Sequence, residues 1–548
     1  MSNKNTILKQ AGILVMAGIL SRIIGFIYRI PLTGIIGNLG NGYYGFAYLI
    51  YANVLLITSY SIPGAVSKVI AERLAMKEYR NAQRVFHCSF IYVIIVGGIA
   101  SIVTFFIAPY LVREESVAVL RVLCPTIFFS GILGVYRGYF QAHKTMVQSS
   151  ISQILEQIMN AIISVMLAAV FVQLASGTDE RNIAVNGAIG SALGTGAGVL
   201  AALLFMIIVY QYNRKSIQRK VHRDKTTYEE SYQSAFKIII AVVTPIVLST
   251  FIYNFNTNLN GMVFDKILNS VKLYDAETVD KLYGIFSGKS VVLVNVPIAI
   301  ASAMAATLLP NIAGTYSLGG EKEVSKQVND TLKILMIIVI PIAVGILVFA
   351  GPIMRFMYSQ KGEWELAASL LRILSLNVIL TSISTLSNAV LQALGQPKKT
   401  VVNASIALIV QTIVFVILLV FTNLDVYALA IATVLYAVLM CILNRRTVIK
   451  YLSYKQDIKT TYIYPIIASF VMGAIALGIY SLLYLIYPSN RIVLIITVLM
   501  AIIVYFATII KLGGVSEMEI SKLPKGNLLV AFAKRFKILK TSTSSLIE

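Results

Sequence analysis

The stretch from Leu8 to Leu32, which reads LKQAGILVMAGILSRIIGFIYRIPL, decides the fold of this chain because it is apolar and long enough to cross a bilayer as one helix. It nevertheless carries Arg22 near its middle and Arg29 toward its end. The two arginines are seven residues apart, close to two helical turns, so both project from one face. A charged side chain in contact with lipid costs several kcal/mol, and we therefore expect this face to line a polar cavity or to meet an opposite charge. For Arg29, snorkelling to the membrane surface is the alternative.

The composition of the whole chain indicates a membrane protein. Of its 548 residues, 57% are hydrophobic and only 13% are charged, so a soluble fold would have too little polar material to cover its surface. Successive apolar segments of helical length predict an all-α integral membrane protein with fourteen transmembrane helices.

The formal charge of +22 reflects membrane topology rather than nucleic-acid binding. If the N-terminus is cytoplasmic, about 30 of the 46 lysine and arginine residues fall in inner segments and about 8 fall in outer loops. This asymmetry follows the positive-inside rule and favours contact with anionic lipid of the inner leaflet. We therefore predict a multi-pass protein of the bacterial plasma membrane, with both termini in the cytoplasm and no nucleic-acid partner.

Neither the cysteines nor the histidines form a recognisable site. They show no CxxC spacing and no cluster with metal-ligand spacing, so we expect small buried thiols and no disulfide, metal or other cofactor. These residues are Cys88, Cys124, Cys441, His87, His143 and His222.

The chain contains an internal repeat. The segment LRVL at residues 120–123 is answered by LRIL at residues 371–374, and further matches follow at the same offset of 251 residues. Two pseudo-symmetric six-helix lobes of the same orientation are therefore predicted, in which Arg121 and Arg372 occupy equivalent positions. The predicted parts are an N-lobe at residues 1–225, a C-lobe at 226–455, two further spans at 456–512 and a basic cytoplasmic tail at 513–548.

The predicted helix near residues 147–175 carries a polar stripe on one face, formed by Ser149, Gln153, Glu156 and Asn160. Glu156 is the acid at membrane depth. We expect it to pair with one of the arginines, and a proton or cation site is the alternative.

Two other helices have unusual composition. The helix that begins near residue 235 ends in YNFNTNLN, where Asn254 and Asn258 lie one turn apart on one face and are expected to line water or an ion site. The helix near residues 185–212 is rich in glycine, which permits close approach of a neighbouring helix.

Six cations are predicted at membrane depth, and only Glu156 offers an acid against them. A cavity that they share would select an anion, and arginine suits phosphate because it can bind two oxygens at once. The outer loops lack the clustered carboxylates or histidines needed for acid–base catalysis, so the sequence indicates a transporter rather than an enzyme. The predicted substrate-binding residues are Arg22, Arg29, Arg121, Arg137, Lys289 and Arg372.

Two motifs resemble those of a known family. They are SRIIGF at residues 21–26, followed by Arg29, and YGIFSGKSVVLVNVPIAIASAMAATLLPNIAG at residues 283–314. With fourteen predicted spans, the chain resembles the polysaccharide-transporter and lipid II flippase branch of the multidrug/oligosaccharidyl-lipid/polysaccharide exporter superfamily along nearly its whole length.

The resemblance implies alternating access by two six-helix lobes around a cationic cavity that binds the diphosphate of an undecaprenyl-linked sugar. It also implies that the last two helices form a groove for the lipid tail. Arg22 matches the essential arginine of the first helix in this family. Arg29 and Lys289 match less directly. The Gram-negative lipid II flippases have an Arg-Asp pair one position earlier, where this chain reads Tyr28-Arg29 without an acid, and their helix-eight arginine lies about one turn away from Lys289.

These observations predict a monomeric flippase that moves an undecaprenyl-diphosphate-linked glycan precursor, such as lipid II, from the inner to the outer leaflet. The membrane potential would drive an anion outward by about 2.3 kcal/mol per charge per 100 mV, and coupling to a monovalent cation stays open. Three alternatives remain: an exporter of polysaccharide repeat units, a multidrug/cation antiporter of the same superfamily, and a scaffold that recruits cell-wall enzymes through the last two spans.

Overall fold

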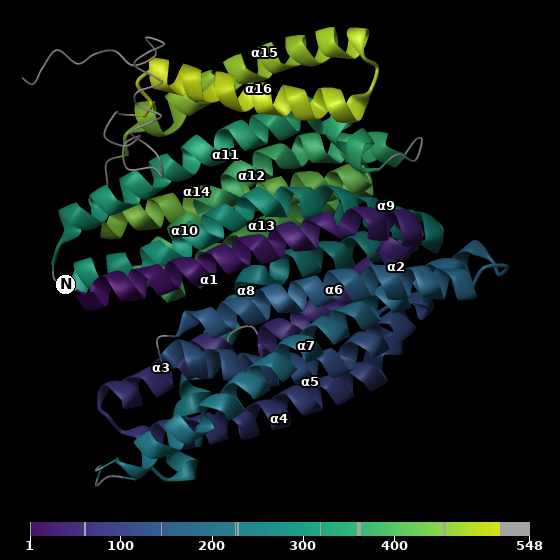
Figure 1. The fold of residues 1–548 in the computed structure, drawn as a ribbon. Coiled ribbons are helices and arrows are strands. Elements are labelled where there is room, and N and C mark those ends of the chain that lie inside the picture. Colours follow the sequence, from purple (N-terminus) through teal and green to yellow (C-terminus); the bar gives the residue numbers. More distant parts are fainter. Residues whose placement is uncertain are drawn as a thin grey trace, which may run out of the picture. The chain divides into compact units, whose positions relative to one another are not determined.

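The computed structural model is helical throughout the residues that it describes, which are 2–59, 62–143, 145–224, 226, 229–317, 319–358, 363–452 and 456–515. No strand occurs within these ranges, and the helices follow one another along the chain (Figure 1). The earlier elements are α1 (Ser2–Ile27), α2 (Arg29–Thr58), α3 (Ile62–Ala75), α4 (Tyr79–Leu111), α5 (Glu114–Ala142), α6 (Met146–Leu174), α7 (Glu180–His222), α8 (Tyr232–Ser270) and α9 (Ala276–Ile285). The later elements are the π-helical turn η1 (Phe286–Ser290), α10 (Val291–Ser317), α11 (Glu321–Met357), α12 (Glu363–Ala393), α13 (Pro397–Phe421), α14 (Val426–Tyr451), the π-helical turn η2 (Lys459–Ile463), α15 (Tyr464–Ile486) and α16 (Asn490–Lys511).

Twelve helical segments within the described ranges are long and apolar enough to cross a membrane. The other two predicted spans correspond to α1 and α8. The apolar part of α1 that is described runs over Met16–Ile27, and the side chains of residues 244–254 in α8 are outside the described set. The predicted all-α, multi-pass membrane fold is confirmed.

The first predicted span, Leu8–Leu32, is interrupted in the structure. α1 ends at Ile27 and α2 begins at Arg29. A sharper break comes at Gly37, whose φ of 66° and ψ of −174° lie outside the helical region. Glycine adopts this backbone conformation without the steric penalty of a Cβ atom. The course of α2 therefore changes beyond the point where the hydropathy pattern predicts the end of the first span.

The glycines of α7 allow this helix to lie close against α6. Gly190, Gly194 and Gly198 are four residues apart and therefore share one face. A Cβ atom added at Gly198 would lie 2.6 Å from the carbonyl oxygen of Glu156, and one added at Gly190 would lie 2.6 Å from the backbone nitrogen of Ala168. Both distances are shorter than an ordinary carbon contact, so only glycine permits this approach.

The chain divides into two compact units. The first comprises Met1–Ala299 and Pro397–Tyr436, and the second comprises Ile300–Gln396 and Ala437–Glu548. α10 and α14 each contribute residues to both units. The predicted boundaries of the two six-helix lobes, at residues 225 and 455, lie at other positions and stay a prediction.

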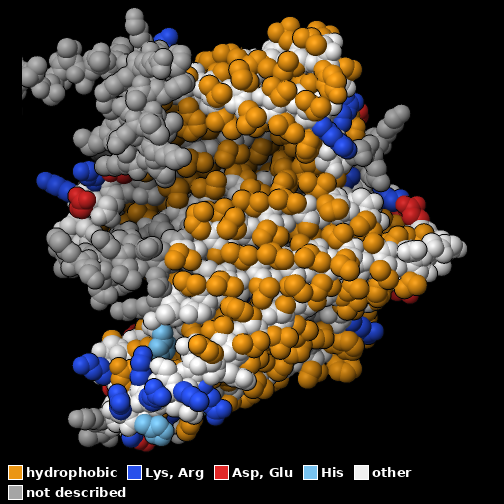
Figure 2. Space-filling view, viewed as in Figure 1, with side chains coloured by type: hydrophobic (Ala, Val, Ile, Leu, Met, Phe, Trp, Pro, Cys, Tyr) orange, Lys and Arg blue, Asp and Glu red, His pale blue; other side chains and the backbone are white. Residues whose placement is uncertain are grey.

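In the second unit, α11 packs against α12 and α15, and α15 packs against α16. The Tyr505 hydroxyl of α16 donates a hydrogen bond of 2.7 Å to the carbonyl oxygen of Ile337 in α11. Large apolar side chains on the other faces of α15 and α16 are exposed, including Phe470, Leu482 and Ile503. On the face drawn in Figure 2, apolar side chains cover most of the described surface and charged ones gather toward its two sides, as expected for a protein whose solvent is lipid.

Candidate functional site

A polar pocket of about 420 Å³ lies inside the first unit, among α2, α3, α5, α6 and α7. Tyrosines, side-chain amides and charged groups make up most of its wall, although the surrounding helices are apolar. Its charged and amide-bearing lining residues are Arg29, Arg137, Gln141, Gln153, Glu156, Gln157 and Asn160. The predicted polar stripe of α6 thus supplies Gln153, Glu156 and Asn160 to the wall.

Arg137 and Glu156 form an ion pair in this pocket. The Nη2 atom of Arg137 lies 2.7 Å from Oε2 of Glu156, and its Nε donates a hydrogen bond of 2.8 Å to Oγ of Ser152. Ser149, the remaining member of the polar stripe, donates to the carbonyl oxygen of Arg137 over 3.3 Å. The acid at membrane depth is therefore matched to an arginine that comes from the neighbouring helix α5.

Arg29 lies against aromatic rings on another wall of the pocket. Its guanidinium carbon is 4.9 Å from the ring centre of Tyr44 and 5.8 Å from that of Tyr28, distances that suit cation–π attraction. Tyr44 and Tyr48 stack with ring centres 5.6 Å apart, and the Tyr44 hydroxyl is 3.1 Å from Oγ1 of Thr195 on α7. The aromatic side chains thus hold the arginine at the wall of the pocket.

The lining residues carry two cations, Arg29 and Arg137, and one acid, Glu156. Since Arg137 and Glu156 offset each other, the formal charge of the wall is positive. Such a pocket favours an anion that also carries hydroxyl groups, because the amides offer both hydrogen-bond donors and acceptors and the tyrosine rings offer flat apolar faces.

The other predicted cations lie elsewhere. Arg22 is exposed on α1 and does not line this pocket. Arg121 lies in a separate shallow hollow between α4 and α5, where its guanidinium carbon is 5.2 Å from the ring centre of Phe105 and its Nε donates to the Phe105 carbonyl oxygen over 3.4 Å. Arg372 is exposed on α12 in the second unit. The structure therefore brings together Arg29 and Arg137 from the predicted set.

Lys289 is fully buried, with 0% of its surface exposed, in the π-helical turn η1. The adjacent Gly288 lies against Asn41 of α2, since a Cβ atom added there would be 3.1 Å from Cγ of Asn41. π-helical turns recur at functional sites because they re-aim side chains within a helix. A buried lysine in this turn is consistent with such a role.

The two predicted asparagines, Asn254 and Asn258, lie in α8. Asn258 is buried, and its Nδ2 donates a hydrogen bond to Oδ1 of Asn53 on α2. The side chain of Asn254 lies outside the described residues. Asn258 therefore forms part of a packed amide pair in this structure.

The hydropathy pattern did not reveal an ion cluster in which Arg113 lies next to both Asp265 of α8 and Asp280 of α9. Its Nη1 atom is 2.8 Å from Oδ2 of Asp280, a side chain of which only 2% is exposed, and its Nη2 pairs with Asp265. The three residues are widely separated in sequence and follow no common spacing, so the pattern carried no signal for them. The hydropathy pattern also did not distinguish the tyrosines of the pocket from aromatic residues of an ordinary core.

The comparisons with known proteins agree with this architecture. The family model described as polysaccharide biosynthesis protein matches residues 7–315, and the MatE model matches residues 288–418. Lipid II flippase MurJ of Bacillus subtilis (strain 168) is 26% identical over 466 residues, which are 80% of this chain and 83% of the relative. Stage V sporulation protein B of the same organism is 26% identical over 492 residues, covering 86% of this chain and 90% of the relative.

Solved structures show the same fold. A lipid II flippase MurJ in an inward closed conformation matches with a TM-score of 0.66 and 15% identity, covering 90% of this chain and 97% of that one. An outward-facing multidrug resistance MATE family transporter matches with a TM-score of 0.58 and 17% identity, over 81% of this chain and 96% of that one. The model of the polysaccharide biosynthesis protein family matches more than half of the 548 residues of this chain, and the chain therefore belongs to that family.

Proposed function

We propose that this protein is a flippase that moves a polyprenyl-diphosphate-linked glycan precursor from the inner to the outer leaflet by alternating access. The observation that carries this proposal is the polar pocket in which Arg29 and Arg137 meet tyrosines and side-chain amides. A peptidoglycan precursor such as lipid II is the preferred cargo. One relative that matches this chain over most of both lengths is named a lipid II flippase, and this supports the choice.

The pocket chemistry suits the two polar parts of such a lipid. Guanidinium groups bind phosphate oxygens through paired hydrogen bonds, and this assigns the diphosphate to Arg29 and Arg137. Amides such as Gln153 and Asn160 would exchange hydrogen bonds with sugar hydroxyls, while the ring of Tyr48 would contact the apolar face of a sugar ring.

The Arg137–Glu156 ion pair would open when a negatively charged cargo binds. An arriving diphosphate competes with the Glu156 carboxylate for the same guanidinium. The displaced carboxylate then takes a proton or a cation, or leaves its charge to be offset by the surrounding amides. The membrane potential favours outward movement of the bound anion by about 2.3 kcal/mol for each net negative charge per 100 mV.

We expect the remaining predicted cations to line a cationic path outside this pocket. Arg22, Arg121, Lys289 and Arg372 would meet the head group at other stages of the cycle. The last two helices, α15 and α16, would hold the polyprenyl tail, since their exposed apolar faces match a hydrocarbon chain.

The test is outward movement of a fluorescent polyprenyl-diphosphate sugar in proteoliposomes, measured as the fraction that an external quencher reaches. We expect Arg29→Gln and Arg137→Gln to lower the initial rate at least tenfold while the purified protein stays monodisperse. Lys322→Gln removes an exposed cation of α11 and is the matched control, for which an unchanged rate is expected. Normal rates in both pocket variants would refute the assignment.

The same vesicles test the multidrug/cation antiporter alternative. The motive for this test is the match of the MatE family model to residues 288–418. A pocket of positive formal charge disfavours organic cations. We therefore expect no accumulation of tetraphenylphosphonium under a proton or sodium gradient. Accumulation that depends on Glu156 would favour the antiporter instead.

A further inference from the structure

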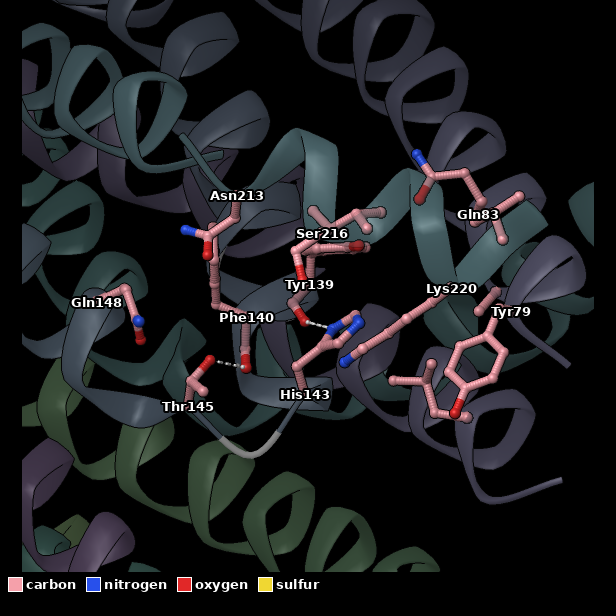
Figure 3. A pocket seen from close by; sticks show the side chains of 14 residues that line it. Tyr79, Gln83, Tyr139, Phe140, His143, Thr145, Gln148, Asn213, Ser216 and Lys220 are labelled. Atoms are coloured by element: carbon pink, nitrogen blue, oxygen red, sulfur yellow. Dashed lines mark hydrogen bonds between the residues drawn. The ribbon is translucent and has the colours of Figure 1, made fainter. Parts of the chain in front are cut away.

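A second cavity lies in the first unit, where several helices of the bundle end. It has a volume of about 190 Å³ and is bounded by the start of α4, the end of α5, the start of α6 and the last turns of α7 (Figure 3). It shares no lining residue with the polar pocket. The cavity is far larger than the 10–15 Å³ or so needed to hold one water molecule, so it can accept a small polar group.

The helix ends around the cavity favour a position near the boundary between hydrocarbon and head groups. The candidate membrane spans that border the cavity begin at Tyr79, end at Ala142 and begin again at Met146. The lining residue His143 lies in the short connection between the last two of these points. A ligand in this cavity would therefore lie level with the phosphates of the bilayer rather than with its acyl chains.

The charge of the cavity is positive. Among the described residues that line it, Lys220 is a cation and none is an acid. Figure 3 shows the Lys220 ammonium pointing toward the His143 ring from α7. The same end of α7 also exposes Arg214, Lys215 and Arg219, and Figure 2 shows basic and histidine side chains gathered at this end of the first unit.

The nearby carboxylates Glu229 and Glu230 are matched to arginines of α3 and α4, and Asp224 accepts hydrogen bonds from the backbone N–H of Arg80 and from Thr226. Glu229 accepts hydrogen bonds from Arg80 and Arg84, and Glu230 accepts one from Arg73. Within the described part of the chain, no ion pair is formed by Lys220. Its charge is therefore available to a ligand of the cavity.

Two further groups define what that ligand must carry. His143 places its Nδ1 atom 2.9 Å from the carbonyl oxygen of Tyr139, which leaves Nε2 as the nitrogen that can gain a proton for an anion. On the opposite wall, Oε1 of Gln148 is buried and has no hydrogen-bond partner among the described residues. A buried acceptor of this kind costs free energy until a donor reaches it.

We propose that this cavity binds a phosphate ester that also carries a hydroxyl group, such as the head group of an anionic glycerophospholipid. The phosphate would lie between Lys220 and His143, and a head-group hydroxyl would donate to Gln148. Basic pockets between helices at the membrane surface bind anionic lipid head groups in this way, and lysine serves as a compact positive charge for phosphate. The site is independent of the transported cargo.

Binding would be coupled to protonation of His143. Burial lowers the pKa of His143, the hydrogen bond to the Tyr139 carbonyl oxygen raises it, and the charge of Lys220 lowers it again, so that the net pKa lies below the usual value for histidine. A bound phosphate reverses the effect of Lys220 and favours the imidazolium. The other ionisable groups lining the cavity are Lys220 of α7, Tyr79 of α4 and Tyr139 of α5. Affinity should therefore rise as the pH falls from 8 to 6.

The test is native mass spectrometry of the delipidated full-length protein, titrated with phosphatidylglycerol or phosphatidylcholine in mixed micelles. We expect wild type to prefer phosphatidylglycerol and Lys220→Gln to lower its affinity for that lipid about fivefold, as expected for loss of one lysine at a membrane surface. The control Lys215→Gln removes an exposed charge of the same helix that does not line the cavity, and its affinity should stay close to that of wild type.

Two variants refine the assignment. Gln148→Leu should weaken phosphatidylglycerol binding but not phosphatidic acid binding, because only the former lipid has the hydroxyl groups. His143→Gln should remove the dependence on pH. Competition by sn-glycerol 3-phosphate would assign the site to a soluble phosphate ester of the same chemistry, and lack of competition would assign it to the lipid.

Equal phosphatidylglycerol affinity in wild type, Lys220→Gln and Lys215→Gln would overturn the proposal, as would equal affinity of wild type for the two lipids. Arg137→Gln, which removes a cation from the polar pocket, should leave this binding unchanged. The lipid assay and the transport assay can therefore fail separately.

Discussion

Gly198→Ala is the most direct perturbation of the polar pocket, because it adds a single methyl group where α7 lies against Glu156 and Asn160 of α6. The new Cβ atom would lie 2.6 Å from the Glu156 carbonyl oxygen and 3.0 Å from Cβ of Asn160. Ordinary van der Waals contact begins at 3.4 Å, so α6 and α7 must separate by roughly 0.8 Å. Both Glu156 and Asn160 would move with the backbone of α6.

The free energy of this change combines two opposing effects. Overpacking of a close contact costs about 1–3 kcal/mol, while replacing glycine by alanine inside a helix gains about 1 kcal/mol. We therefore expect Gly198→Ala to be destabilised by up to about 2 kcal/mol. Gly34→Ala is the matched control, because a Cβ atom at this helical position of α2 meets nothing within 4 Å. It should be neutral or stabilised.

The assay is the midpoint of thermal unfolding of the purified protein in detergent, followed by the flippase rate in proteoliposomes. We expect Gly198→Ala to unfold at a lower temperature than wild type and Gly34→Ala at an equal or higher one. The rate of Gly198→Ala should also fall, because a shift of this size misplaces the Arg137–Glu156 pair. If Gly198→Ala proves as stable as Gly34→Ala, the close packing of α6 and α7 does not define the pocket.

Three further predictions concern charges. Arg137→Glu should reduce the yield of folded protein by placing two acids together, and the double variant Arg137→Glu/Glu156→Arg should restore folding, measured by size-exclusion chromatography, without restoring transport. Arg29→Lys should keep part of the flippase rate that Arg29→Gln loses, because lysine retains the charge but not the paired donors. Hydrogen bonding from Arg84 lowers the pKa of Glu229, so this contact contributes stability above the unfolded-state pKa of about 4.3 and loses it as the pH falls through the lower folded value. The unfolding midpoint of wild type should therefore drop more than that of Glu229→Gln between pH 6 and pH 3.

Local sequence patterns predicted much of the fold. The segment LRVL in α5 and the segment LRIL in α12 indicated equivalent helices, and these helices end at Ala142 and Ala393, at the same offset as the repeat. The break at Gly37 was not predicted, because hydropathy reports how apolar a segment is and carries no information on backbone dihedral angles.

The sequence by itself determined the class of protein, the order of its helices and the face on which each polar residue lies, since composition and helical period depend on neighbours along the chain. Thus the spacing of Gln153, Glu156 and Asn160 was enough to assign them to one stripe. Only the tertiary structure decided that this stripe pairs with Arg137 and lines the same pocket as Arg29, while Arg121 lies against Phe105 on another face of the bundle. The physical reason is that helical periodicity orients a side chain about its own axis, whereas the partner across the gap depends on how separate helices pack, and in α7 that packing depends on the absence of a Cβ atom at its glycines.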